Sequence, residues 1–373
     1  MLPIMGMKGL TRLILLSIAT SGFAIEKNPP LLPLSPAAPS GDWVINSSFL
    51  IWQSKEWGLE FAAKSYEPTN LGTTSKALDE KSFVCDFAWR SGLKLTLGRQ
   101  LPYDNWDTQV RWVYYHGQLT NLKRLFESVT SPAGVGVIPL WYYPFYAIAA
   151  EQEVRYGFGQ AHWKLYFNSL DWELGRTNLV VDPVTIRFHV GLKGAWLRQQ
   201  YHVDYANGIE VETNIPGIAG LSTLQLQSSG LSFKSDAWGL GPRAGFGTHW
   251  IWGWGVGVFA EGAFTLMYSS FETYRRQTDT VDNITASEEQ IYTMNLTDNF
   301  RRAAPVGELI LGFDWHREWS SAGVLFQIAY EMQYWWAQNG FRRNYLTRAP
   351  ATTEQMRGDL QMHGLTATLG VDF

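Results

Sequence analysis

The residues of this 373-residue chain that could do chemistry are histidines and carboxylates on one face of its predicted strands. A hydrolase would need a nucleophile, or a pair of carboxylates, with a histidine at hydrogen-bonding distance. No nucleophile motif accompanies the candidates, so we favour histidines in a water-filled interior over an active site and expect no enzymatic activity. The candidates are His162, His189, His249 and His316, with Asp171 and Asp314 as neighbours.

The sequence contains no pattern that is typical of metal, nucleotide or nucleic-acid binding. No His or Cys pair has the spacing of a metal-ligand set, and the single cysteine, Cys85, allows no internal disulfide. The Gly-x-Gly patterns at 239–245 and 253–257 fall in predicted strands and turns rather than before a helix. With 30 Lys and Arg against 34 Asp and Glu, the chain lacks a basic footprint for nucleic acid. We therefore expect no cofactor, no metal and no nucleic-acid partner.

Charged residues of both signs form the larger candidate site, because they fall on the polar face of strands whose other face is apolar. We expect them to line the interior of a barrel. The basic residues are Arg90, Lys94, Arg111, Lys164, Arg187, Lys193 and Arg243. The acidic residues are Glu261, Glu308, Asp314 and Glu331, with Asp107, Asp171 and Glu173 on earlier strands.

Two arrangements of these charges are open. The inward charges are mainly basic in the earlier strands and mainly acidic in the later ones. Opposed walls would create a transverse field across a water-filled pore, which would orient polar solutes. Alternatively, the Arg and carboxylate side chains pair and fill a narrow interior, because about 8 strands leave little room beyond side chains and about 16 leave an aqueous channel.

The assignment of faces rests on a period of two. Between Phe83 and Leu97 the odd positions are mostly apolar, whereas Asp86, Arg90 and Lys94 occupy even positions. This alternation is typical of a strand with lipid on one side and water on the other.

One segment breaks the alternation. Its apolar parity changes from Trp163 to Leu170. We interpret the change as a β-bulge near Asn168 and Ser169, which would place Lys164 inside.

The composition fits a transmembrane β-barrel. The chain is 46% hydrophobic and only 17% charged, with 35 Gly and 18 Trp, which excludes a disordered protein. Its mean hydropathy of −0.15 excludes a bundle of membrane helices. A barrel combines an apolar lipid face, a polar lumen and aromatic rims, and its average therefore comes out near zero.

We predict an all-β, antiparallel up-and-down barrel of about 10 strands. The strands are expected at 42–64, 82–101, 106–117, 154–175, 184–202, 234–250, 255–275, 302–317, 322–337 and 355–373. Short links alternate with long ones at 65–81, 118–153, 203–233, 276–301 and 338–354. Short periplasmic turns and long extracellular loops produce this alternation. Tryptophans also gather near the short links, where an interfacial aromatic girdle is expected: Trp106, Trp172, Trp250, Trp252, Trp254, Trp315 and Trp319.

The 118–153 link is unusually apolar for an external loop. Packing is therefore favoured over exposure. The link could constrict the barrel mouth, add a hairpin that raises the strand number to 12, or bury itself against a second protomer.

The two ends of the chain indicate export and assembly. A basic and then apolar start with small residues at 21–24 predicts a signal peptide over 1–24, followed by a proline-rich linker over 25–41 and one barrel domain over 42–373. In the last strand Leu369, Val371 and Phe373 alternate with polar residues. A strand with an aromatic final residue is typical of the signal that the barrel assembly machinery recognises, so we predict the bacterial outer membrane as the location.

Several segments resemble one family, the pore-forming outer-membrane proteins grouped around Legionella, which is similar to the major-outer-membrane-protein-like porins of environmental Chlamydiae. They are FLIWQ at 49–53, FAWRSGL at 87–93, WD at 106–107, WKLYFN at 163–168, DWELGR at 171–176, GLKGAW at 191–196 and WGLGPR at 238–243. The resemblance implies a β-barrel porin. Chlamydial proteins of this kind are cysteine-rich, whereas this chain has only Cys85, so the resemblance does not extend to disulfide cross-linking.

The expected function is passive diffusion of small polar solutes or ions through a charged lumen. The alternative is a non-conducting barrel whose long loops act in adhesion or envelope structure. Expected partners are outer-membrane lipid, the assembly machinery and small polar solutes. Solute size, charge selectivity, a homo-oligomeric state and a host partner for the loops stay open.

Overall fold

The computed structural model describes residues 43–65, 69–70, 76–77, 80–83, 87–102, 104–119, 122–125, 136–142, 147–148, 154–181, 183–214, 221–284, 287–319, 322–344 and 353–373. The predicted signal peptide and linker lie outside these residues, as does Cys85.

Within the described ranges, no helix is long and apolar enough to cross a membrane.

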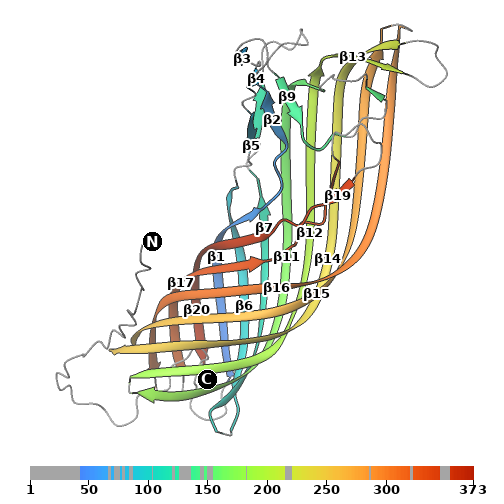
Figure 1. Ribbon diagram of the computed structural model, residues 1–373. Helices are drawn as coiled ribbons and strands as arrows, with labels where there is room; N and C mark the ends of the chain where they lie inside the picture. Colours follow the sequence, from blue (N-terminus) through green and yellow to red (C-terminus); the bar gives the residue numbers. More distant parts are fainter. Residues whose placement is uncertain are drawn as a thin grey trace, which may run out of the picture. The chain divides into compact units, whose positions relative to one another are not determined.

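Ten antiparallel strands form a closed ring, which confirms the predicted strand number (Figure 1). Each strand pairs with the next in the ring, and the last pairs with the first. In ring order they are β1 (Trp43–Glu56), β6 (Trp89–Gln100), β7 (Trp106–Gln118), β11 (Tyr156–Val181), β12 (Val184–Gly208), β14 (Leu221–Gly253), β15 (Val256–Asn283), β16 (Glu288–Trp319), β17 (Ala322–Trp335) and β20 (Leu360–Asp372).

Among the described residues, ten short strands lie in the links between the ring strands. They are β2 (Ala62–Ser65), β3 (Thr69–Asn70), β4 (Lys76–Ala77), β5 (Glu80–Phe83), β8 (Leu122–Leu125), β9 (Gly136–Pro139), β10 (Ala147–Ile148), β13 (Glu210–Asn214), β18 (Arg342–Asn344) and β19 (Thr353–Gln355). Since these strands do not enter the ring, the fallback of 12 ring strands is wrong.

The two ends of the barrel domain close the ring side by side. The Trp43 N–H donates to the Phe373 carbonyl at 2.9 Å, and the Phe373 N–H donates to the Trp43 carbonyl at 3.0 Å. Both residues lie at the end that carries the short turns. Leu369, Val371 and Phe373 all face outward and are 59%, 40% and 54% exposed.

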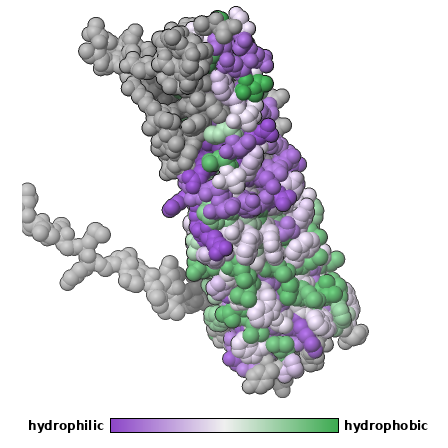
Figure 2. Space-filling model, turned by 90° about the vertical axis from the view of Figure 1, so that its right-hand side faces the viewer, coloured by the Kyte–Doolittle hydropathy of each residue, from purple (hydrophilic) through white to green (hydrophobic). Residues whose placement is uncertain are grey.

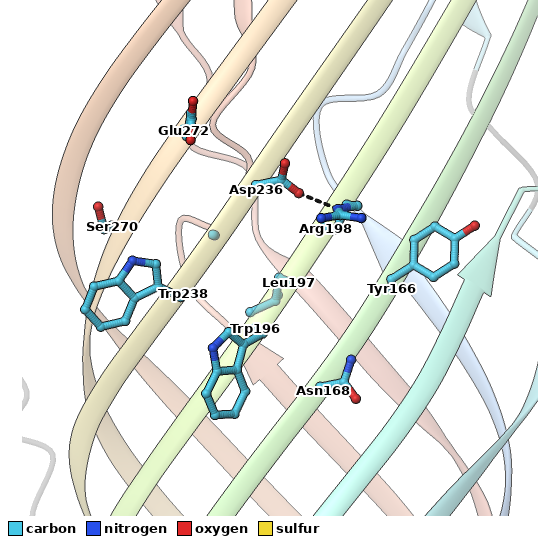
Figure 3. A pocket seen from close by; sticks show the side chains of 10 residues that line it. Tyr166, Asn168, Trp196, Leu197, Arg198, Asp236, Trp238, Ser270 and Glu272 are labelled. Atoms are coloured by element: carbon cyan, nitrogen blue, oxygen red, sulfur yellow. Dashed lines mark hydrogen bonds and ion pairs between the residues drawn. The ribbon is translucent and has the colours of Figure 1, made fainter.

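Two belts of exposed aromatic side chains bound an apolar band around the barrel. Figure 2 shows the apolar band on one face of the barrel, and Figure 3 shows Trp196 and Trp238 of one belt. On β14, Trp250 marks the belt near the short turns and Trp238 the opposite belt. Twelve residues at about 3.3 Å each, on a strand tilted by about 45°, span about 28 Å across the membrane. This height matches the apolar band of an outer-membrane barrel, which is about 25 Å. We call the second belt, at the level of Trp196 and Trp238, the outer belt.

Five neighbouring strands continue far past the outer belt. β11, β12, β14, β15 and β16 are 25 to 33 residues long, whereas a tilted strand crosses the bilayer with about 9–11 residues. The predicted loops 203–233 and 276–301 are therefore largely strand (Figure 1). We call the part of the barrel beyond the outer belt the extension.

The side-chain pattern inverts between the band and the extension without any change of register. On β11, Asp171 and Glu173 face inward within the band, and Trp163, Leu165 and Phe167 face inward in the extension. The pairing of β11 with β12 is continuous from Phe158 to Leu179. The predicted β-bulge near Asn168 is therefore wrong, because the outside solvent changes from lipid to water and no residue is inserted.

Three segments pack against the inward-facing side chains of the extension, and two of them include residues of the strands β9 and β2, which continue the sheet beside β11. They are residues 57–63, 136–142 and 337–343, and together we call them the plug. Trp141 is fully buried, with ring centroids 4.9 Å from Phe233 and 5.5 Å from Tyr201, which both face inward from the barrel wall. Part of the predicted 118–153 loop thus packs inside the barrel, while most of the remaining loop residues lie outside the described ranges.

Hydrogen bonds tie the plug backbone to buried side chains. The Tyr201 hydroxyl donates to the Leu59 carbonyl at 2.9 Å, and Arg275 Nη2 donates to the Trp141 carbonyl at 2.8 Å. The plug segments also bond to one another: the Leu140 N–H donates to the Phe61 carbonyl at 3.1 Å. These bonds satisfy irregular backbone that is removed from water.

Asp279 lies buried on β15 in the extension. Its carboxylate accepts hydrogen bonds from Ser229 Oγ at 2.6 Å and from Gln277 Nε2 at 3.0 Å. Burial raises the pKa of Asp279 to about 7, and these hydrogen bonds only partly oppose the rise.

The pKa of Asp279 predicts a pH dependence of stability. The folded pKa of about 7 lies above the ordinary value of 3.8, so between these values the folded protein holds a proton that the unfolded chain releases. The free energy of unfolding should therefore fall as pH rises from about 4 to about 7, and the Asp279→Asn variant should lack this contribution. Urea unfolding of the refolded protein across this range, wild type against variant, measures it. Parallel curves would contradict the assignment.

The lipid-facing band predicts a second outcome. Val190 faces outward within the band and is 58% exposed. Val190→Arg should therefore destabilise the folded protein in a bilayer by about 2–4 kcal/mol. Thr293→Arg, on an exposed outward position of the extension, is the control and should change the stability little. Reversible folding into vesicles measures both variants. If the two substitutions destabilise the protein equally, the position assigned to the apolar band is wrong.

Candidate functional site

The lumen within the apolar band is filled with charged side chains. Most predicted lumen residues lie there with at most 8% exposure: Lys94, Arg111, Arg187, Lys193, Arg243, Glu261, Asp314 and Glu331. The Glu308 side chain also lies inside, with 6% exposure. These side chains project from the inward positions of β6, β7, β12, β14, β15, β16 and β17.

A central network joins strands that are not neighbours in the ring. Lys193 Nζ on β12 lies 2.6 Å from Glu308 Oε1 on β16 and 2.8 Å from Asp171 Oδ2 on β11. Arg243 on β14 bridges Glu308, at 2.6 Å from Nη1, and Glu173, at 2.8 Å from Nε. Each carboxylate is thus compensated by a cation in a space with almost no access to solvent.

Arg187 extends the network toward the short-turn end. Its guanidinium binds the Asp107 carboxylate in a bidentate way, with Nη2 at 2.6 Å from Oδ1 and Nε at 3.0 Å from Oδ2. Its Nη1 also lies 3.4 Å from Glu173 Oε2, which accepts a second hydrogen bond from Gln109 Nε2 at 2.6 Å. This planar geometry suits arginine and not lysine.

Further pairs cross the lumen or close its ends. Lys94 on β6 pairs with Glu331 on β17, and Arg111 on β7 lies 3.5 Å from Glu261 on β15. His249 Nε2 lies 2.9 Å from Asp314 Oδ1, and His316 Nε2 lies 3.2 Å from Asp372 Oδ1. Basic and acidic side chains are therefore in contact, so the hypothesis of two separated charged walls is wrong. The alternative of pairing across a narrow interior describes this lumen.

One predicted lumen residue lies on the outer face. Lys164 shares the outward face of β11 with Leu170 and Trp172, because no bulge reverses the parity. Arg90, near the start of β6, keeps the parity of Lys94 and pairs with the inward-facing Trp52, but it is exposed and not buried in the charge network.

Sequence reasoning missed the buried polar group in the extension, Arg275 and Asp279, because the strand was predicted to end at Arg275 and Asp279 fell in the predicted loop 276–301. A signal for it exists: the inward positions Tyr201, Val203 and Tyr205 continue the period of two in the neighbouring segment.

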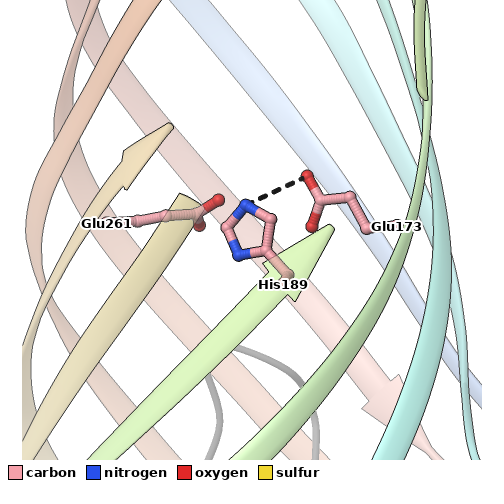
Figure 4. A group of neighbouring side chains, drawn as sticks. All are labelled: Glu173, His189 and Glu261. Atoms are coloured by element: carbon pink, nitrogen blue, oxygen red, sulfur yellow. Dashed lines mark ion pairs between the residues drawn. The ribbon is translucent and has the colours of Figure 1, made fainter. Parts of the chain in front are cut away.

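Glu173, His189 and Glu261 offer ligand atoms within 4.8 Å of one another, which is a geometry that could hold a metal ion (Figure 4). The surrounding charges do not fit a cation. Arg243 contacts both carboxylates, at 2.8 Å and 3.9 Å, and Arg111 contacts Glu261. Because the guanidinium groups already neutralise these carboxylates and would repel a divalent ion, we assign the group to the charge network.

Two of the cavities between these side chains are small. One of about 50 Å³ lies between Lys94, Arg111, Glu261 and Glu331, and one of about 10 Å³ lies beside Asp171 and Glu308. The larger one has room for one or a few water molecules.

The closed ring, the apolar band, the aromatic belts and the polar interior define a class, the outer-membrane β-barrel proteins. Within this class the chain belongs to the Legionella pneumophila major outer membrane protein family, whose sequence model matches residues 36–373. This match confirms the resemblance that the sequence segments carry.

Solved structures with a similar course of the chain are also outer-membrane proteins. The protease OmpT of Escherichia coli shares 9% identity at a TM-score of 0.37, over 90% of this chain and 98% of that chain. A FadL homologue of Pseudomonas aeruginosa shares 9% identity at a TM-score of 0.27, over 89% and 90% of the two chains. These likenesses are too distant to bear on function. Comparison with curated proteins finds no match.

The charge network predicts a large effect of one uncompensated charge. Glu173→Gln keeps the shape but removes the anion between Arg187 and Arg243, so it should lower the free energy of unfolding by about 3–5 kcal/mol. Glu272→Gln, on the exposed outer face of β15, should change it by less than about 0.5 kcal/mol. Urea unfolding in detergent micelles compares the two, and equal effects would exclude a network at Glu173.

Proposed function

We propose that the protein conducts small ions and small polar solutes across the outer membrane by passive diffusion. The observation that carries this proposal is the row of charged side chains through the whole apolar band, from His316 and Asp372 at the short-turn end to Lys94 and Glu331 near the outer belt. Charges inside a membrane-spanning structure are costly, and where they occur they mark ion and solute pathways.

The size of the solutes follows from the packing of this lumen. A cavity of about 50 Å³ admits water and small ions but no sugar. Passage requires neighbouring ion pairs to exchange partners and the plug to shift. The proposal is therefore a narrow channel of low conductance and not a wide diffusion pore.

Removal of a plug side chain tests the proposal. Trp141→Ala removes the fully buried indole between Phe233 and Tyr201 and should raise the open probability several-fold in planar bilayers. Trp254→Ala, at a 99% exposed turn position outside the lumen, is the control and should leave it unchanged. Liposome swelling should show that sugars are excluded from wild-type protein. If neither wild type nor Trp141→Ala opens at any voltage, the channel proposal fails.

A second candidate is a closed barrel that acts through its extracellular surface. The observation that favours it is the plug itself, in which Trp141, Tyr142 and Phe341 are almost completely buried. Under this candidate the extension presents a rigid surface to an envelope or host partner. If neither the wild type nor Trp141→Ala shows channel openings in the planar-bilayer experiment, that result would support this candidate.

We further infer a non-enzymatic role and export through a cleaved signal peptide. In the lumen, His249 and His316 each lie against a carboxylate, at 2.9 Å and 3.2 Å, within an ion-paired interior. The outward, strand-terminal Phe373 suits recognition by the barrel assembly machinery. Mass spectrometry of the protein from outer membranes should find a mature chain that begins after Ala24, and an intact amino terminus would contradict the cleavage.

A further inference from the structure

A hollow on the outer surface of the barrel lies at the outer belt (Figure 3). It has a volume of about 530 Å³ and opens between β11, β12, β14 and β15. Its lining combines aromatic rings with charged groups: Tyr166, Trp196, Arg198, Asp236, Trp238 and Glu272. The lumen lies on the other side of the wall, so this site is independent of the proposed channel.

The hollow has an apolar side toward the membrane. Trp196 and Trp238 are register partners across β12 and β14, and their side chains are 52% and 58% exposed. Below them Leu192 and Leu240 continue the lipid-facing surface. Rings at this level suit the junction between acyl chains and polar head groups.

The opposite side of the hollow is charged. Arg198 Nε lies 2.6 Å from Asp236 Oδ1, and Lys234 Nζ lies 2.8 Å from Asp236 Oδ2. Asp236 thus holds two cations close together, and their side chains remain 58% and 46% exposed. Arginine and lysine in such a pair can bind a phosphate while they keep their shared carboxylate.

The register shows that this positive charge extends over five adjacent strands. Outward positions from the outer belt to six residues above it form four rows, which run across β11, β12, β14, β15 and β16. These rows contain five cations and two anions, a difference of three positive charges. The cations are Lys164, Arg198, Lys234, Arg276 and Arg301, and the anions are Asp236 and Glu272.

This excess lies where the outer leaflet presents its head groups. The outer belt is at the end of the band opposite the chain termini and the short periplasmic turns. The outer leaflet of a Gram-negative bacterium consists largely of phosphorylated glycolipid, whose phosphates lie just above the acyl chains. Cations near a membrane surface attract such anionic lipids by about 1 kcal/mol each.

We propose that this hollow binds one phosphorylated glycolipid of the outer leaflet. An acyl chain lies along Trp196 and Trp238, and a phosphate group binds Arg198 and Lys234. The other three cations hold neighbouring lipids of the same kind around this side of the barrel.

The test measures binding of purified lipid A to the full-length refolded protein by native mass spectrometry. Wild type should bind lipid A at least about tenfold more tightly than the dephosphorylated lipid. The Arg198→Gln/Lys234→Gln variant should lose this preference. Arg99→Gln/Arg317→Gln, which removes two outward cations beside Trp43 and Trp319 at the other belt, is the matched control and should keep it.

Two outcomes would overturn the proposal. One is equal affinity of wild type for the phosphorylated and dephosphorylated lipids. The other is displacement of lipid A by millimolar inorganic phosphate, which would identify a site for a free anion. Trp238→Ala provides a second line of evidence. It leaves the charges in place and should weaken the binding of the phosphorylated and the dephosphorylated lipid to the same extent. Channel conductance enters none of these measurements, so failure here leaves the proposed function untouched.

Discussion

The pairing of β20 with β1 is the interaction on which the rest of the structure depends. Hydrocarbon offers no hydrogen-bond partners, so every backbone N–H and C=O group at the membrane level must pair within the protein. Thirteen residue pairs, from Val44 with Asp372 to Glu56 with Leu360, join the first strand to the last and close the ring within the apolar band. Once the ring is closed, the pleat sends each residue either to the lumen or to the surroundings, and both the charge network and the lipid face follow from this division.

One pleat serves two different cores because the surroundings change along the strands. Within the band, lipid outside selects apolar residues there and leaves charged residues to meet inside. Beyond the outer belt, water selects polar residues outside, and apolar side chains pack around the plug. β14 passes through both environments in a single strand of 33 residues. The transition from a polar to an apolar interior thus needs no irregularity in the backbone.

The sequence predicts the membrane part of this fold well and the extension poorly. The positions of the short turns and the ten strands follow from a period of two that is strong where lipid is outside. At Trp163 and Leu165 the same period continues with the opposite parity, and only the surrounding solvent distinguishes this case from a bulge. The inward direction of Arg187 and Lys193 also follows from parity. Their partners do not, because contacts across the lumen depend on the stagger of strands that are not neighbours.

The inversion of the pattern also protects the strands against misalignment. If β11 slipped by one residue relative to its neighbours, Asp171 and Glu173 would enter the lipid at one level while Lys164 entered the apolar interior at the other. Two chemically opposite surroundings would therefore reject the same error at the same time. A barrel that ended at the membrane surface would have only one such safeguard. The long strands thus fix their alignment through two independent environments.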